Sequence, residues 1–169
     1  MKVFTLQNGK RLNEKEFCSY FEKKVFSTIR KHKLIGRKDK IKVQNKILLF
    51  ILTKFCNLYN IQKPSLKPKT FTKLSISDNL DTGSEFVLSS LMKNNFSFNK
   101  IKPRSGKIIK PFFFCSEKEI QLYSKLKRIP YKSEKKSDIS KWLDELEKRQ
   151  KGIKNSIISS LIKIQKIKN

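Results

Sequence analysis

One stretch, from Lys110 to Ile153, limits the possible folds of this chain more than any other, because it marks where a strand ends and two helices begin. A short apolar run ends at Cys115, and Ser116 is followed three residues later by Glu119. This spacing is a capping box, in which the serine hydroxyl accepts the Glu119 N–H and the Glu119 carboxylate accepts the Ser116 N–H. The pattern predicts an apolar strand followed directly by a helix that begins at Ser116.

Two amphipathic helices are expected within this stretch. The first should end near Arg128, because Pro130 disfavours helical geometry at the residue before it. The second should begin near Ser137 or Asp138 and end at Gly152. Their apolar faces carry Ile120, Tyr123 and Leu126 in the first, and Ile139, Trp142, Leu143 and Leu146 in the second.

The rest of the chain alternates short apolar runs with helical patterns. A hairpin is expected before residue 13, with its turn at Asn8–Gly9. Asn13 and Glu16 then have capping-box spacing before a helix with an apolar face of Phe17, Phe21, Val25 and Ile29. Strands are expected at 39–43, 74–76 and 108–114, the last broken by Pro111 at an edge or bulge. Helices are expected at 45–56, 84–92 and 155–168, and loops at 57–72 and 96–107.

This order of elements predicts an α/β fold: a small, mostly parallel sheet of about three strands with helices packed on it. A chain of 169 residues suits a single domain with a sizeable core. The terminal helix carries a wide apolar stripe of Ile153, Ile157, Leu161 and Ile164. Core packing is the favoured interpretation of this stripe, and docking of a partner subunit is the alternative.

The charge of the chain points to a polyanionic partner. Forty Lys and Arg residues face 14 acidic residues, a formal net charge of +26. Such a charge favours RNA or DNA, with strong salt dependence of binding. The alternative is an AT-rich coding sequence, since the chain has no alanine and only five glycines. That bias raises the lysine content without any binding function.

The cysteines and apolar runs indicate a cytoplasmic protein. Cys18, Cys56 and Cys115 are isolated, so they suggest neither a disulfide framework nor a Cys-x-x-Cys metal pair, and a reducing compartment is expected. The longest apolar run, Ile47 to Leu52, is too short to span a membrane, and no secretory signal is expected at Met1 to Leu12. We therefore predict no membrane partner.

Several short motifs together resemble a known family. In order they are Glu117-Lys118-Glu119-Ile120, Leu122-Tyr123, Pro130-Tyr131, Leu146-Glu147 and Gly152-Ile153-Lys154. They resemble the C-terminal half of the cytoplasmic and archaeal tRNA 2-thiolation enzymes, which are ATP-pyrophosphatases of the PP-loop superfamily. The resemblance implies a reduced PP-loop fold, similar to the adenine nucleotide alpha hydrolases. It implies two parts: residues 1–36, a hairpin and basic helix left from a zinc ribbon, and residues 37–169, an α/β domain without the phosphate loop.

The chemical groups of that family are missing here. Its enzymes use ATP, magnesium, an iron–sulfur cluster and zinc, but Asn13 and Glu16 stand where zinc ligands are expected, and Ile129 replaces a cluster cysteine. Lys46 is the sole cation where a glycine-rich loop would bind phosphates. No cofactor is therefore predicted. The segment Asn79-Leu80-Asp81 resembles another family motif, and an ordinary helix cap explains it equally well.

The site prediction is limited to basic residues. The basic helix and the loop after it carry the predicted RNA-binding set: Lys23, Lys24, Arg30, Lys31, Arg37 and Lys38. No catalytic or metal-binding residue is predicted. Cys115 is interpreted as a buried small residue, and His32 has no assigned role.

Three functions remain open at the level of sequence. The first is a non-catalytic member of the wobble-uridine 2-thiolation family that binds tRNA, or an accessory subunit that meets an active thiolation subunit or a sulfur-carrier protein. The second is an unrelated basic RNA-binding or ribosome-associated protein. The third is a reduced but active tRNA thiolation enzyme. ATP binding would separate the third from the first, and preference for tRNA over bulk RNA would separate the first from the second.

Overall fold

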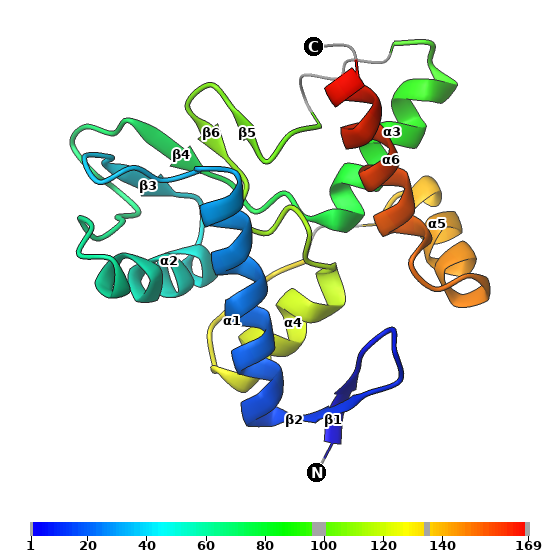
Figure 1. Cartoon of the computed structure of the whole chain (residues 1–169), viewed down its shortest axis with the longest axis horizontal. Coiled ribbons are helices and arrows are strands. Elements are labelled where there is room, and N and C mark those ends of the chain that lie inside the picture. The colour runs from blue at the N-terminus through cyan, green and yellow to red at the C-terminus, as the bar shows by residue number, and fades with distance from the viewer. Residues whose placement is uncertain (1, 96–100, 134–135, 168–169) are drawn as a thin grey trace.

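The structure is a computed structural model that describes residues 2–95, 101–133 and 136–167. It has the predicted α/β class, with six helices in the described residues (Figure 1). The strands are β1 Lys2–Thr5, β2 Arg11–Asn13, β3 Ile41–Val43, β4 Lys73–Ser75, β5 Arg104–Ser105 and β6 Ile108–Ile109. The helices are α1 Glu14–Lys31, α2 Lys46–Leu58, α3 Leu80–Met92, α4 Glu117–Leu126, α5 Asp138–Arg149 and α6 Ile153–Ile167.

The central sheet has four strands in the order β3-β4-β6-β5. β3, β4 and β6 are parallel, and β5 is an antiparallel edge strand. The predicted strand before helix 45–56 therefore lies beside the predicted strand 74–76, and α4 follows the next strand along the sheet. β1 and β2 form the predicted hairpin as a separate antiparallel pair, with Gly9 at φ +82° in its turn.

The third predicted strand, 108–114, is wrong beyond Ile109. Pairing stops there, and residues 111–115 form turns in which the Phe113 N–H donates to Lys110 O and the Cys115 N–H to Phe112 O. Pro111 has no N–H to donate to a sheet ladder, which explains the early end. The expected loop 96–107 is also partly wrong, because β5 pairs with β6 across a turn containing Gly106. Residues 96–100 of that loop lie outside the described residues.

The main core lies between one face of the sheet and helices α1, α2 and α4. Every residue of the predicted apolar face of α1 is at most 1% exposed. The Phe21 ring of α1 stacks on Tyr123 of α4 with centroids 4.5 Å apart. Burying each such side chain contributes about 1.5–3 kcal/mol, so this face holds α1 on the sheet. Because α1 shares its core with the later helices, the boundary near residue 36 stays a prediction.

One face of the sheet is packed more fully than the other. Ile41 and Val43 of β3 and Ile109 of β6 are at most 2% exposed. The alternating residues Lys42, Leu74 and Ile108 lie opposite one another in register and point to the other face. Ile108 is 38% exposed, and Lys42 and Leu74 are partly exposed. The strand pattern therefore alternates, as in a sheet with one face toward solvent.

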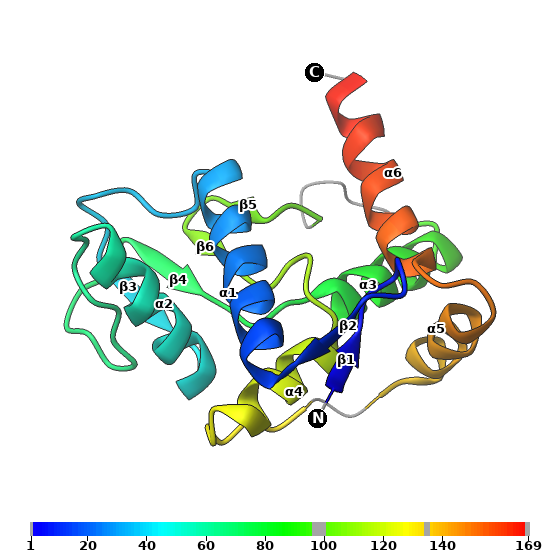
Figure 2. The same cartoon turned by 60° about the horizontal axis from the view of Figure 1, so that its bottom comes forward.

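Helices α3, α5 and α6 form a second group beside the sheet, at the right of Figure 1 and around the red α6 in Figure 2. Their small core contains Leu80, Val87, Ile101, Phe113 and Ile158. The stripe on α6 packs partly on this core: Ile157 and Leu161 contact it, whereas Ile164 is 42% exposed. No helix in the described residues is both long and apolar enough to cross a membrane.

Candidate nucleic-acid interface

The carboxyl ends of β3 and β4 meet at one edge of the sheet, where open α/β folds commonly bind ligands. Side chains from the turns after these strands contact each other at this edge. The Gln44 Oε1 accepts hydrogen bonds from the Ser77 backbone N–H at 2.9 Å and from its hydroxyl at 3.1 Å. The Asn45 Oδ1 accepts the Leu48 N–H at 3.1 Å and so caps α2. The turn after β3 is thus tied to its neighbours by side chains.

This turn does not fit a triphosphate. A phosphate loop offers several backbone N–H groups around one anion, and here Asn45 already occupies one N–H of the first turn of α2. None of residues 41–48 has a positive φ of the kind that folds a backbone nest. Lys46, at the start of the helix, is exposed and is the only cation between Val43 and Ile47. The carboxyl edge of the sheet is therefore present, but the turn after β3 does not form a phosphate-binding loop.

The residues present do not fit a metal cluster either. In the described part of the chain, no three His, Cys, Asp or Glu side chains are grouped to hold a metal ion. Cys18, Cys56 and Cys115 are buried and free. Burial raises the pKa of all three thiols, that of Cys56 to about 11, so they stay protonated at neutral pH. Metal ligation requires the thiolate, so none of them is prepared for it.

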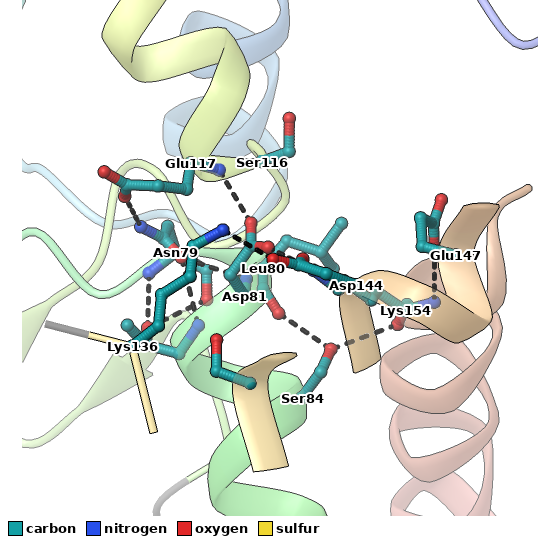
Figure 3. A network of polar contacts seen from close by, with 12 residues as sticks. Asn79, Leu80, Asp81, Ser84, Ser116, Glu117, Lys136, Asp144, Glu147 and Lys154 are labelled. Atoms are coloured by element: carbon teal, nitrogen blue, oxygen red, sulfur yellow. Dashed lines mark hydrogen bonds and ion pairs between the residues drawn. The ribbon is translucent and has the colours of Figure 1, made fainter. Parts of the chain in front are cut away.

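The Asn79-Leu80-Asp81 segment is a helix cap joined to a polar network (Figure 3). The Asn79 Oδ1 accepts the N–H groups of Asp81 and Thr82, which confirms the cap interpretation. The Asn79 Nδ2 also donates to Glu117 at 2.8 Å, and the Glu117 N–H donates to Asp81 at 2.6 Å. These contacts join the first turns of α3 and α4.

Lys154 extends the same network to the other two helices of that group. Its ammonium forms ion pairs with Asp81 of α3 and Asp144 of α5, and the residue is only 4% exposed. Burial by itself would lower the pKa of Lys154, but the hydrogen bonds to Asp144 and Asp81 outweigh it and hold the pKa above its ordinary value. The charges are therefore neutralised within the network, which joins α3, α5 and α6.

Lys24 is separated from the rest of the predicted RNA-binding set. Its Nζ forms an ion pair with Glu119 of α4, 2.8 Å from both carboxylate oxygens. Tyr20 donates to the same carboxylate at 3.1 Å, and Glu119 itself is 3% exposed. The capping residue predicted from sequence is thus also the partner of this lysine. Because its charge is already paired, we leave Lys24 out of the interface proposed below.

The other five predicted residues, Lys23, Arg30, Lys31, Arg37 and Lys38, are exposed. Lys23 and Arg30 lie seven residues apart, nearly two full turns, so they share one side of α1. Arg30 and Arg37 line the same pocket, about 350 Å³ in volume, together with Lys33 and Tyr59. Lys33 lies two residues after the end of α1 and could have been found from its place in the basic run. Tyr59 lies at the end of α2, and nothing in the sequence pattern pointed to it.

Comparison with known proteins gives a structural likeness without a sequence match. No family model and no curated protein matches the sequence. Among solved structures, the chain is similar to the U34-tRNA thiolase NcsA from Methanococcus maripaludis, determined with its [4Fe–4S] cluster. The TM-score is 0.73 at 15% identity, over 96% of this chain and 84% of that chain. The chain therefore has the α/β fold of a PP-loop thiolase, which confirms the predicted fold class.

Proposed function

We propose that this protein binds tRNA through exposed cations at the end of α1, as a non-catalytic relative or accessory subunit of the tRNA wobble-uridine 2-thiolation enzymes. The observation that carries the proposal is the grouping of Arg30 and Arg37 at one pocket, with Lys23 on the same side of α1. In the described residues none of the three forms an ion pair, so their charge is available to phosphates.

The likeness to a tRNA thiolase supports tRNA as the polyanion. The capped turn after β3 and the protonated, buried thiols support a role without ATP or cluster chemistry. An accessory role would place this chain beside an active thiolation subunit or a sulfur-carrier protein.

Binding of tRNA over a range of salt concentrations tests the proposal. The variant Lys23→Glu/Arg30→Glu/Arg37→Glu should bind more weakly, and its log–log salt slope should be shallower by about 2–3, since each lost phosphate contact removes about 0.7–0.9. The control is Arg149→Glu/Lys151→Glu/Lys163→Glu, three exposed cations on α5, α6 and the turn between them. Lys154 is unsuitable as a control, because it is buried in ion pairs.

The two variants carry the same net charge. Any difference in their tRNA affinity therefore reports where the substituted cations lie. Equal losses would mean that net charge alone attracts RNA, and the interface at α1 would be wrong. An unstructured RNA of equal length is measured in parallel. Equal affinity for it and for tRNA would favour the unrelated RNA-binding protein over the thiolation relative.

A further inference from the structure

The pocket at the ends of α1 and α2 has a defined charge and an aromatic wall. Arg30, Lys33 and Arg37 line it on the α1 side, and Phe55 and Tyr59 line it on the α2 side. None of its lining residues is acidic. Asp39 does not line the pocket, but its carboxylate lies at the edge, where it accepts the N–H of the lining residue Gly36 at 2.7 Å and the Thr72 hydroxyl at 2.9 Å. The pocket therefore presents three cations without a carboxylate among its lining residues.

Both walls are fixed by the backbone. After α1, Lys33 has φ +48° and the Leu34 N–H donates to Ile29 O at 3.0 Å. After α2, Asn60 has φ +52° and the Ile61 N–H donates to Cys56 O at 2.9 Å. Each is a Schellman-type helix end. A residue in the left-handed conformation turns the chain, so that the next N–H groups donate to the last carbonyls of the helix. The cations and the aromatic ring thus extend from well-defined helix ends.

The balance of charge favours an anion. Two helix C-termini lie at the pocket, and each contributes about half a negative charge, roughly one in total. The Asp39 carboxylate, bonded to Gly36, adds one more negative charge. The three cations exceed the sum, so a phosphate group is attracted to the pocket. The bonds described above already occupy part of each helix end, which weakens the opposing effect of the dipoles.

The aromatic wall offers a stacking surface. The Tyr59 ring packs on Phe55, with ring centroids 4.6 Å apart. Phe55 and Phe26 in turn form an edge-on ring pair with centroids 5.3 Å apart. Phe55 is 3% exposed, whereas Tyr59 is 43% exposed. Proteins bind single-stranded nucleic acids with this combination of an exposed aromatic ring, held by packing, and neighbouring cations. Every base has a face that can stack on such a ring.

From this arrangement we propose that the pocket holds one nucleotide of a single-stranded RNA segment, with its base stacked on Tyr59 and its phosphates facing Arg30 and Arg37. The inference rests on the proposed function and names the part of the RNA that enters. The volume of about 350 Å³ is near the lower end of the usual range for ligand pockets, about 300–1,000 Å³, which suits one nucleotide. Inside a duplex the faces of each base are covered by the neighbouring base pairs, so an internal base of duplex RNA cannot stack on Tyr59.

Substitutions at Tyr59 test the inference with a short single-stranded RNA and with tRNA. Tyr59→Leu keeps apolar packing on Phe55 but removes the aromatic face, and it should weaken single-strand binding about five-fold or more. Tyr59→Phe keeps the ring and should bind like the wild type. Trp142→Ala, which removes an exposed ring on α5, is the matched control and should leave affinity unchanged. Thermal unfolding of each variant checks that the fold is intact.

The outcomes separate the two proposals. If the wild type binds tRNA but Tyr59→Leu binds as tightly, the stacking pocket is wrong and the cationic interface stands. If the wild type fails to bind tRNA, the proposed function is wrong and the inference fails with it. Competition by an equally long RNA duplex, as strong as by the single strand, would also overturn the inference.

An RNA strand and a free nucleotide both offer a base and a phosphate to the pocket. A separate titration therefore distinguishes them. UMP and AMP are titrated against the wild type and Tyr59→Leu. Within an RNA strand the neighbouring phosphates add contacts with Lys23 and Lys38, so the oligonucleotide should bind at least ten-fold more tightly than either mononucleotide. Equal affinity would overturn the assignment to an RNA strand.

Discussion

At the scale of single residues, Ser75 is the clearest energetic weakness. Its side chain is fully buried in β4, and in the described residues its hydroxyl has no hydrogen-bond partner. An unpaired buried hydroxyl costs free energy, so Ser75→Ala should raise the free energy of unfolding by about 1 kcal/mol. The midpoint of urea unfolding measures this change.

Ser124→Ala is the matched control. This serine is 4% exposed, and its hydroxyl donates to Ile129 O at 2.5 Å. Its removal leaves that carbonyl without its donor and should lower the free energy of unfolding by about 1 kcal/mol. A lower midpoint for Ser75→Ala would show that the hydroxyl is satisfied in solution.

At the scale of elements, the network that joins α3, α5 and α6 should make stability depend on pH. Burial by itself would raise the pKa of Asp144, but hydrogen bonds from Lys136 and Lys154 outweigh it and lower the pKa below its ordinary 3.8. A lowered pKa contributes stability that is present above the unfolded value, about 3.9, and is lost as the pH falls through the folded value. Asp144 thus stabilises the three helices at neutral pH.

Asp144→Asn should therefore lower the free energy of unfolding at pH 7 by about 1.5–3 kcal/mol, the range for hydrogen bonds to charged groups. The difference from the wild type should shrink as the pH falls below about 4, because the wild-type carboxylate is then protonated as well. Urea unfolding of both proteins at pH 7, 4 and 3 measures this difference in the free energy of unfolding. Glu145→Gln, at an exposed position on the same helix, serves as the control. A difference that stays constant from pH 7 to pH 3 would contradict the role given to Asp144.

At the scale of the whole molecule, the fold is similar to that of a tRNA thiolase, and in the described residues no three His, Cys, Asp or Glu side chains are grouped to hold a metal ion. We expect ATP binding to be absent or weak, because the turn after β3 is capped and has no backbone nest. Titration calorimetry with ATP and magnesium measures this. Metal analysis of protein purified without oxygen should find iron and zinc well below one per chain. Micromolar ATP affinity or a stoichiometric metal content would support the active enzyme instead.

The sequence by itself determined the local structure, because capping boxes and apolar periodicity act over three to eight residues. Asn13 with Glu16 and Ser116 with Glu119 form the predicted caps, and the helices that follow have the predicted buried faces. The mostly parallel sheet also followed from the sequence, through the order of the expected strands and helices along the chain. The break of the third strand at Pro111 was expected, but β6 ends at Ile109 and residues 111–115 form turns instead. An apolar run by itself does not reveal whether its backbone finds a partner strand.

Only the tertiary structure decided how distant residues meet. It paired Lys24 with Glu119, 95 positions away, and so separated that lysine from the other predicted RNA-binding residues. It also brought Tyr59 to the pocket of Arg30 and Arg37, across the loop and strand that connect α1 to α2. Side-chain charge and aromaticity are visible in a sequence. Which side chains become neighbours depends on how the apolar faces of α1, α2 and α4 pack on the sheet. The burial of those faces is a property of the whole fold.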